Sequence, residues 1–424
     1  MKKRIFSLFL VFVLVCTMLS SCLFVPLVSQ TGDEYLTKEE VEALINGAIL
    51  DGSKVEAGDT NNIYIENPVN TNTAAAAKGL LSAVSVYCNF KIYSSGYERS
   101  ETSAGAGVIY KLDKNSGDAY IITNYHVVYN SKASTKNKVS DDIYVYLYGQ
   151  ETVGYTEPNY AIKATYIGGT MNYDLAVLKV SGSATLAKSA AVEATVSNSD
   201  LVQVLDTAIA IGNPEGAGIS ATLGSVNVDS EYITMTGADN VSEVSMRVMR
   251  VDTAVNSGNS GGGLYNDKGE LIGIVNAKMA ASSVDNIGYA IPSNVVKAIA
   301  DNIIYYCSDG ERESVYRCLL GITVRISDMY TEIDSDSLKI YKRERVAVEE
   351  VNSAGLAKGK LLKGDVIEAI TIDGVRYEVN RMYNVVDSML NARVGSTVVL
   401  SVDRGGAKET VTITVTEATL TQEK

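Results

Sequence analysis

Histidine and tryptophan are almost absent from this chain of 424 residues, which contains one histidine, His126, and no tryptophan. A single imidazole excludes metal sites built from several histidines, and it leaves one candidate for any reaction that needs an imidazole base. Positive charge is also scarce, because 37 lysine and arginine residues stand against 50 acidic ones, a formal net charge of −13. A face that binds nucleic acid must be basic to displace counterions from phosphates, so this balance argues against a nucleic-acid partner.

An apolar run stands at the N-terminus. Three basic residues precede residues 5–19, which are largely apolar, and two serines then precede Cys22. This order predicts a secretory signal, and the Ser-Ser-Cys sequence resembles a bacterial lipobox. Cys22 would then be lipidated and residues 1–21 removed. A retained transmembrane anchor is the alternative because residues 23–28 prolong the apolar stretch, but the unbroken run is shorter than the roughly 20 residues of a spanning helix.

The predicted signal has consequences for the location of the mature chain and for its cysteines. We expect the mature chain to lie outside the cytoplasm, held by lipid to a bacterial cell membrane on the cell surface or the periplasmic side. In such an oxidising compartment Cys307 and Cys318, 11 residues apart, could form a disulfide, or they could remain two thiols. Cys88 lies in an apolar run and is predicted to be a core residue.

The rest of the chain divides into domains by its patterning. With 46% hydrophobic and 21% charged residues, it can form folded domains rather than a disordered chain. Many short β-type runs punctuated by Gly, Asn and Ser predict an all-β barrel or sandwich, which ends in a helix at 293–306. After it we expect an α+β module whose strands flank helical stretches near 353–362 and 380–391. The predicted segments after the signal are an anchor, short helix and linker at 22–78, the β domain at 79–306, a linker at 307–318 and the module at 319–420.

A glycine-rich segment surrounds Ser260. Small neighbours let a substrate backbone approach, and a tight turn can direct several N–H groups toward one point. Ser260 is therefore a candidate nucleophile. Gly258, Asn259 and Ser260 form the candidate oxyanion hole, with the amides of Gly258 and Ser260 as donors. An ordinary glycine-rich loop is the alternative interpretation.

His126 and Asp174 complete a candidate catalytic set. His126 follows a predicted strand and can serve as the base that a serine nucleophile requires, while Asp174 precedes an apolar strand and can hold the imidazole in one tautomer. Either residue could be incidental by itself, the aspartate as a solvated strand start. The chain order His, Asp, Ser is that of chymotrypsin-fold enzymes rather than of α/β-hydrolases or subtilisins.

These segments together resemble the HtrA/Deg family of secreted serine proteases. The matching motifs are Thr-Asn-x-His-Val around His126, Asp-Leu-Ala-Val-Leu-Lys from Asp174 and Gly-Asn-Ser-Gly-Gly around Ser260, and residues 210–214 and 288–293 are also similar. The resemblance implies a mostly β fold with two antiparallel six-stranded barrels and an active site in the cleft between them. It also implies peptide-bond hydrolysis through an acyl-enzyme, without a metal or other cofactor.

The same resemblance extends to substrate recognition. Val255 resembles a residue that lines the pocket for the side chain before the cleaved bond, where the family prefers small or medium aliphatic groups. Ala254 stands where trypsin-like enzymes place an acid, which disfavours cleavage after Lys or Arg. The segment Val275, Asn276 and Ala277 is expected to form the edge to which the substrate backbone adds.

Leu320, Gly321 and Ile322 resemble the carboxylate-binding loop of PDZ domains. Residues 352–357 and 362–370 are similar to further stretches of HtrA-type PDZ domains. The resemblance implies a PDZ domain that captures peptide C-termini through backbone N–H groups and strand addition. An unrelated α+β module is the alternative.

The resemblance implies a surface-tethered serine endopeptidase that acts on unfolded or damaged proteins outside the cytoplasm. Its partners would be unfolded proteins or peptides, C-terminal peptides, the membrane through the lipid, and further copies in a homotrimer or higher oligomer. The alternative is a non-proteolytic chaperone or PDZ-type binding protein that uses the barrels as a scaffold. The complete set His126, Asp174 and Ser260 favours the protease.

Overall fold

The computed structural model describes residues 54–57, 63–66, 71–94, 97–150, 160–277, 287–335 and 339–423. The predicted signal, Cys22 and the short helix before residue 54 lie outside these ranges. The chain divides into two units, residues 1–69 and 70–424. In the first unit β1 (Lys54–Ala57) pairs antiparallel with β2 (Ile63–Glu66). Within the described ranges, no helix has both the length and the apolar character needed to span a bilayer.

The first half of the second unit forms a closed antiparallel barrel with the strand order β3-β4-β5-β8-β7-β6. The sequence of β8 is almost continuously apolar because its alternate residues pack in two different core clusters. Ala176 and Leu178 pack in the barrel core, whereas Leu175 and Val177 pack in the cluster that contains α6 (Ser293–Cys307). The strands are β3 (Ala83–Ser94), β4 (Tyr97–Asp113), β5 (Asp118–Thr123), β6 (Asp142–Leu147), β7 (Ile162–Thr170) and β8 (Leu175–Val180).

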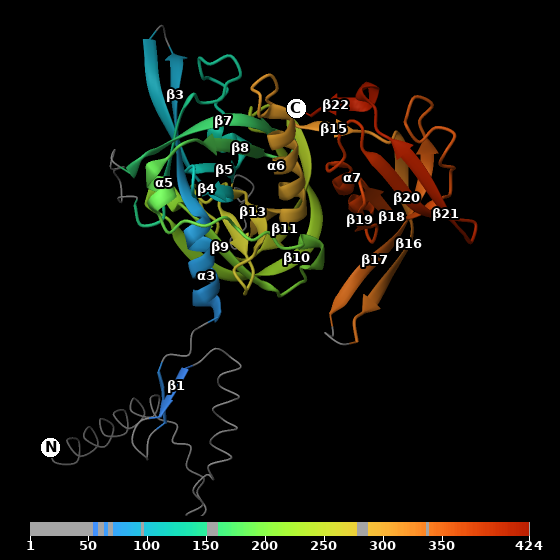
Figure 1. Cartoon of the computed structure of the whole chain (residues 1–424), viewed down its shortest axis with the longest axis horizontal. Coiled ribbons are helices and arrows are strands. Elements are labelled where there is room, and N and C mark those ends of the chain that lie inside the picture. Colours follow the sequence, from blue (N-terminus) through green and yellow to red (C-terminus); the bar gives the residue numbers. More distant parts are fainter. Residues whose placement is uncertain are drawn as a thin grey trace, which may run out of the picture. The chain divides into compact units, whose positions relative to one another are not determined.

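A second closed antiparallel barrel follows, in the order β10-β11-β14-β13-β12-β9. The mostly β fold of two six-stranded barrels is thereby confirmed, as is the helix predicted at 293–306, which is α6. Figure 1 shows α6 running beside the strands of the barrels. The strands are β9 (Thr207–Gly212), β10 (Ser220–Thr236), β11 (Glu243–Val251), β12 (Gly263–Tyr265), β13 (Leu271–Val275) and β14 (Gly288–Pro292).

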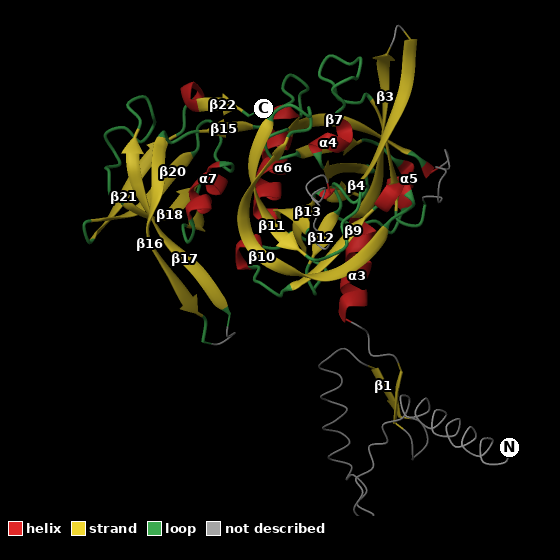
Figure 2. Cartoon of the chain, turned by 180° about the vertical axis from the view of Figure 1, so that it is seen from behind, coloured by secondary structure: helices red, strands yellow, loops and turns green. Residues whose placement is uncertain are grey.

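Helix α3 (Thr71–Ser82) corrects the predicted linker, which extended to residue 78. Its alanine run has the highest intrinsic helix propensity, and tertiary contacts stabilise it further. Ala75 is buried, and the hydroxyls of Ser82 and Tyr265 lie 2.8 Å apart in a hydrogen bond. Figure 2 shows α3 against β9 of the second barrel. Residues 71–78 are therefore part of the folded body.

The C-terminal module has the sheet order β16-β17-β18-β20-β21, with β19 paired to β18. The helix predicted near 380–391 is confirmed as α7 (Met382–Met389). The one predicted near 353–362 is wrong, because these residues form successive turns that include Gly359 at φ +71°. The strands are β16 (Ile322–Ile333), β17 (Ile340–Val351), β18 (Val366–Ile372), β19 (Val375–Glu378), β20 (Thr397–Arg404) and β21 (Ala407–Thr414).

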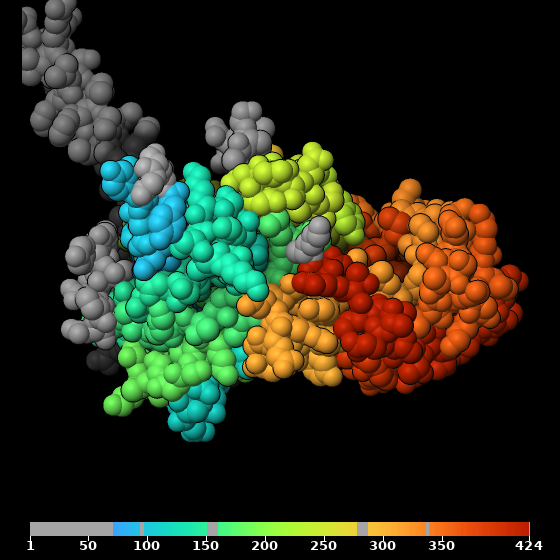
Figure 3. All heavy atoms as spheres, turned by 90° about the horizontal axis from the view of Figure 1, so that it is seen from above, coloured from blue at the N-terminus to red at the C-terminus, as the bar shows by residue number. Residues whose placement is uncertain are grey.

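The predicted linker at 307–318 is also partly structured. Its last residues form β15 (Tyr316–Cys318), which pairs antiparallel with β22 (Leu420–Gln422) at the end of the chain. Glu423 then receives a hydrogen bond from Asn172 Nδ2 at 2.9 Å and pairs with Arg317 at 2.5 Å. Figure 3 shows these last residues, in red, against the body of the molecule.

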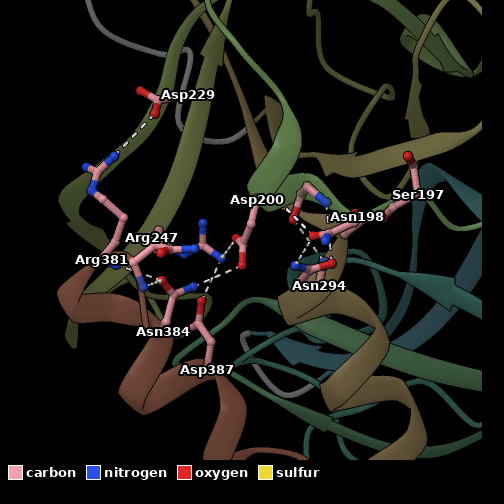
Figure 4. Close-up of polar contacts among 12 residues, drawn as sticks. Ser197, Asn198, Asp200, Asp229, Arg247, Asn294, Arg381, Asn384 and Asp387 are labelled. Atoms are coloured by element: carbon pink, nitrogen blue, oxygen red, sulfur yellow. Dashed lines mark hydrogen bonds and ion pairs between the residues drawn. The ribbon is translucent and has the colours of Figure 1, made fainter. Parts of the chain in front are cut away.

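A buried ion pair connects α7 to the second barrel (Figure 4). Arg247 of β11 is 5% exposed, and its Nη2 lies 2.6 Å from Asp387 Oδ2 of α7. The guanidinium also stacks over the ring of Tyr383, and Asn384 Nδ2 donates to Asp200 at 2.9 Å. An unpaired charge at this depth would be costly, so these contacts hold α7 to the barrel.

Candidate active site

His126 and Asp174 come together at the ends of neighbouring strands of the first barrel. His126 lies in α4 (Tyr125–Val128), directly after β5, and Asp174 directly precedes β8. Asp174 Oδ2 lies 2.6 Å from His126 Nδ1, and its Oδ1 accepts from the backbone N–H of His126 at 2.9 Å. Asp174 has φ +49°, a left-handed conformation that aspartate tolerates better than most residues. The two contacts orient the imidazole and fix its Nδ1 toward the carboxylate.

Two asparagines that the sequence did not assign to this pair support it. Asn276, which is fully buried, donates from Nδ2 to Asp174 Oδ2 at 2.7 Å. Asn124, also fully buried, donates from Nδ2 to the carbonyl oxygen of Asp174 at 2.8 Å. The sequence could have indicated the role of Asn124, because this residue lies in the motif around His126. Asn276 lies 102 residues after Asp174, and no local pattern joins them.

The predicted substrate edge needs correction at Val275. β13 lies between β12 and β14 in a closed barrel, so it is not an edge strand. Val275 is fully buried, its N–H donates to Gly262 and its carbonyl accepts from Gly261. The Asn276 N–H donates to Tyr289. A substrate backbone therefore cannot pair with Val275, and the predicted edge reduces to the segment that follows it.

Ser260 is held at the junction of the two barrels. Its carbonyl accepts from the Ala106 N–H of β4 at 2.8 Å, and its Oγ accepts from the Ala277 N–H at 3.2 Å. Gly261, at φ +85°, lies so close to Thr123 and Ala106 that a Cβ there would be 2.2 Å from the Ala106 carbonyl oxygen. Only glycine allows this approach, which places the serine beside the segment that leads into His126.

Gly258 and Asn259, two of the three predicted oxyanion residues, have different environments. Gly258 adopts φ +94°, and a Cβ at this position would lie 2.2 Å from the Asn213 carbonyl oxygen. The Asn259 side chain is buried and donates to the Ala254 carbonyl at 3.4 Å, so it supports the loop from within. Val255, the predicted pocket residue, packs closely against Gly288.

A cavity of about 330 Å³ opens beside His126. Its walls come from the β3–β4 hairpin and from the segment after α4, and they include Phe90, Glu101, Tyr129 and Lys132. Tyr125 stacks on Tyr129 with ring centroids 5.3 Å apart, and burial raises the pKa of Tyr125 to about 12. The phenol next to His126 is therefore protonated at neutral pH and does not compete as a base. Within the described ranges, no cluster of three metal-ligating side chains occurs.

The predicted peptide-binding loop lies at the start of β16. Gly321 has φ +73° and abuts Gly355, and a Cβ on Gly321 would lie 2.4 Å from the Gly355 Cα. The carbonyl of Leu320 accepts from Ala357 at 3.0 Å, and that of Gly321 accepts from Asn352 at 2.8 Å. Ile322 begins β16, which is the terminal strand in the order of its sheet. A turn followed by a terminal strand is the geometry that strand addition requires.

The possible disulfide between Cys307 and Cys318 is not formed, and both cysteines are free thiols. Cys307 packs in the cluster around α6, and its Sγ–H donates a hydrogen bond to the Ser314 carbonyl at 3.3 Å. Cys318 belongs to the core of the C-terminal module. Burial raises the pKa of Cys307 to about 12 and also raises that of Cys318, which disfavours the thiolate that disulfide formation needs.

Comparisons with known proteins agree with these features. A model of the trypsin-like peptidase domain matches residues 105–274, and a PDZ domain model matches residues 319–415. The serine protease Do-like HtrA of Lactococcus lactis subsp. cremoris (strain MG1363) is 30% identical over 420 residues, covering 89% of this chain and 94% of that protein. Serine protease Do-like HtrA of Bacillus subtilis (strain 168) is 31% identical over 322 residues, covering 75% and 64%. A probable periplasmic serine endoprotease, DegP-like, of Chlamydia trachomatis serovar D is 29% identical over 412 residues, covering 91% and 71%.

Proposed function

The chain belongs to the HtrA family of serine proteases, and on this premise we propose that it cleaves unfolded or damaged proteins outside the cytoplasm with Ser260, His126 and Asp174 as its catalytic residues. The observation that carries the proposal is the contact of 2.6 Å between His126 Nδ1 and the buried Asp174 carboxylate, together with a serine that is hydrogen-bonded to Ala106 of the first barrel and to Ala277 after β13 of the second. Serine endopeptidase activity follows from membership of the family. The individual roles and the substrate class are the proposal.

In the proposed mechanism Ser260 Oγ attacks the peptide carbonyl while His126 Nε2 takes its proton. The hydrogen bond from the Ala277 N–H uses a lone pair of Ser260 Oγ and not its proton, so the hydroxyl can accept this bond and still give its proton to the imidazole. Asp174 holds the Nδ1–H tautomer and stabilises the imidazolium that forms. The N–H groups of Gly258 and Ser260 bind the developing oxyanion. His126 then protonates the leaving amine, and water hydrolyses the acyl-enzyme.

Substrate selection would combine a pocket and a capture domain. Val255 would line the pocket for the residue before the cleaved bond and favour small or medium aliphatic side chains. Leu320, Gly321 and Ile322 would take a peptide C-terminus, with the peptide added along β16. The glycine turn and the terminal position of β16 support the second role.

We further propose that the protein works at a membrane as a homotrimer or higher oligomer. Cleavage of residues 1–21 and lipidation of Cys22 would supply the anchor. The basic start, apolar run and Ser-Ser-Cys sequence support it, and one similar protein is described as periplasmic. Wild type, but not Cys22→Ala, should incorporate a labelled fatty acid, and a wild type that carries no label would refute the lipid anchor.

The test of function compares wild type with Ser260→Ala in detergent, with reduced casein as the unfolded substrate and folded lysozyme as a control. We expect wild type alone to cleave casein, with cleavage sites mapping after aliphatic residues. A wild type that leaves casein intact but suppresses its aggregation, as Ser260→Ala also does, would favour the chaperone alternative. Cleavage by both proteins would contradict the role of Ser260.

A further inference from the structure

A short turn after β9 holds the peptide group that the oxyanion site depends on. The Glu215 N–H donates to the Ser257 carbonyl at 2.8 Å, and the Asn213 N–H donates to the Gly258 carbonyl at 3.3 Å. In a trans peptide the C=O and N–H point in opposite directions. Because Glu215 binds the Ser257 carbonyl, the N–H of Gly258 must point away from the turn. That N–H is one of the two proposed oxyanion donors.

The turn needs external support because its backbone is unusual. Glu215 adopts φ +55°, a left-handed conformation that non-glycine residues rarely adopt. The fully buried Asn213 closes the turn by accepting from the Gly218 N–H through Oδ1 at 2.9 Å. Its Nδ2 donates across to the Gly105 carbonyl of β4 at 3.2 Å. The conformation of the turn therefore depends on contacts with the first barrel.

Tyr87 supplies the second of these contacts. Its hydroxyl donates to the Gly216 carbonyl at 3.2 Å and accepts from Asn213 Nδ2 at 3.4 Å, so one atom joins two residues of the turn. Tyr87 comes from β3 of the first barrel, where its ring packs edge-on against Tyr146 with centroids 5.7 Å apart. The first barrel thus fixes where the hydroxyl lies, and the hydroxyl fixes the turn.

We propose that Tyr87 is a positioning residue for the oxyanion site. It acts through the turn at 213–218, which keeps the Gly258 N–H directed at the oxyanion. The proposal rests on the proposed function, because it assumes that Gly258 donates to the tetrahedral intermediate. It adds a residue of the opposite barrel, 171 positions before Gly258, to the machinery that stabilises the transition state.

The test is Tyr87→Phe in the full chain, which removes the hydroxyl and keeps the ring. A neutral hydrogen bond contributes about 0.5–1.5 kcal/mol, so kcat should fall about 2- to 12-fold. KM should stay within about twofold, because the substrate carbonyl makes its strong contacts only in the transition state. A peptide aldehyde, which forms a tetrahedral adduct with serine, should lose affinity by the same factor as kcat. The affinity of the matching peptide acid should not change.

Tyr93→Phe is the matched control, since Tyr93 is an exposed tyrosine on the same strand, and it should behave as wild type. Thermal unfolding of each variant ensures that comparisons are made on folded protein. An unchanged kcat in Tyr87→Phe would overturn the proposal, and so would equal losses of affinity for aldehyde and acid, which would indicate a general packing defect. A wild type that is folded but inactive would instead refute the proposed function.

Discussion

Asn276 provides a quantitative test of how the catalytic aspartate is held. Its Nδ2 donates at 2.7 Å to Asp174 Oδ2, the same oxygen that His126 Nδ1 contacts at 2.6 Å. Asn276→Ala removes one of the two side-chain donors that fix this oxygen. A hydrogen bond to a charged group contributes about 1.5–3 kcal/mol, and about 1.36 kcal/mol corresponds to a tenfold change in rate. If the loss is felt fully in the transition state, kcat/KM should fall about 10- to 150-fold.

The assay measures kcat/KM on a peptide substrate together with the midpoint of thermal unfolding. Asn302→Ala is the matched control, because Asn302 is also a fully buried asparagine but donates to the Tyr316 carbonyl at 2.7 Å. We expect both variants to lose stability and only Asn276→Ala to lose catalytic efficiency when folded. Catalytic efficiency of folded Asn276→Ala within twofold of wild type would refute the reasoning.

Two further predictions concern the C-terminal module. The side chain of Arg404 holds the pKa of Asp365 below its usual value, so Asp365 stabilises the folded module above its unfolded pKa of about 4. That stabilisation is lost as pH falls through the lower folded pKa. The protection of β20 amides relative to their intrinsic exchange rates should therefore fall on acidification more in wild type than in Asp365→Asn, and equal falls would contradict this. Replacing Asp387 with alanine removes the shorter of the two ion pairs of the buried Arg247 and leaves only Asp200, at 3.7 Å, as its carboxylate partner. Breaking a buried pair costs at most about 3–5 kcal/mol, and this loss should raise exchange in α7. The double variant with Arg247→Met should recover part of it, and no recovery would contradict the pairing.

The all-β class of the first domain and the candidate catalytic set could be predicted because their signals are local, whereas the two-barrel arrangement was implied by the family resemblance. Strand alternation, glycine turns and the motifs around His126, Asp174 and Ser260 each lie within about ten residues of sequence. The chain order of the three residues then restricted the fold. The structure places the imidazole on the carboxylate and the serine at the junction of the barrels.

What the sequence missed depends on partners far away along the chain. Asn276 reaches Asp174 across 102 residues, and Tyr87 reaches Gly216 across 129. Val275 has no free backbone groups because β13 lies between two other strands of a closed barrel. The family resemblance implied the barrel, but the sequence did not indicate the place of β13 in the strand order. The turns at 353–362 replaced a predicted helix because Ala357 donates to Leu320 instead of continuing a helical ladder.

The central claim is that Ser260 is the nucleophile activated by His126. A fluorophosphonate probe, which reacts with activated serines, tests this directly when the labelled peptide is identified by mass spectrometry. We predict one adduct on Ser260 in the wild-type protein, no adduct in Ser260→Ala and strongly slowed labelling in His126→Ala. A folded wild-type protein that carries no adduct, or an adduct on another serine that persists in Ser260→Ala, would contradict the account.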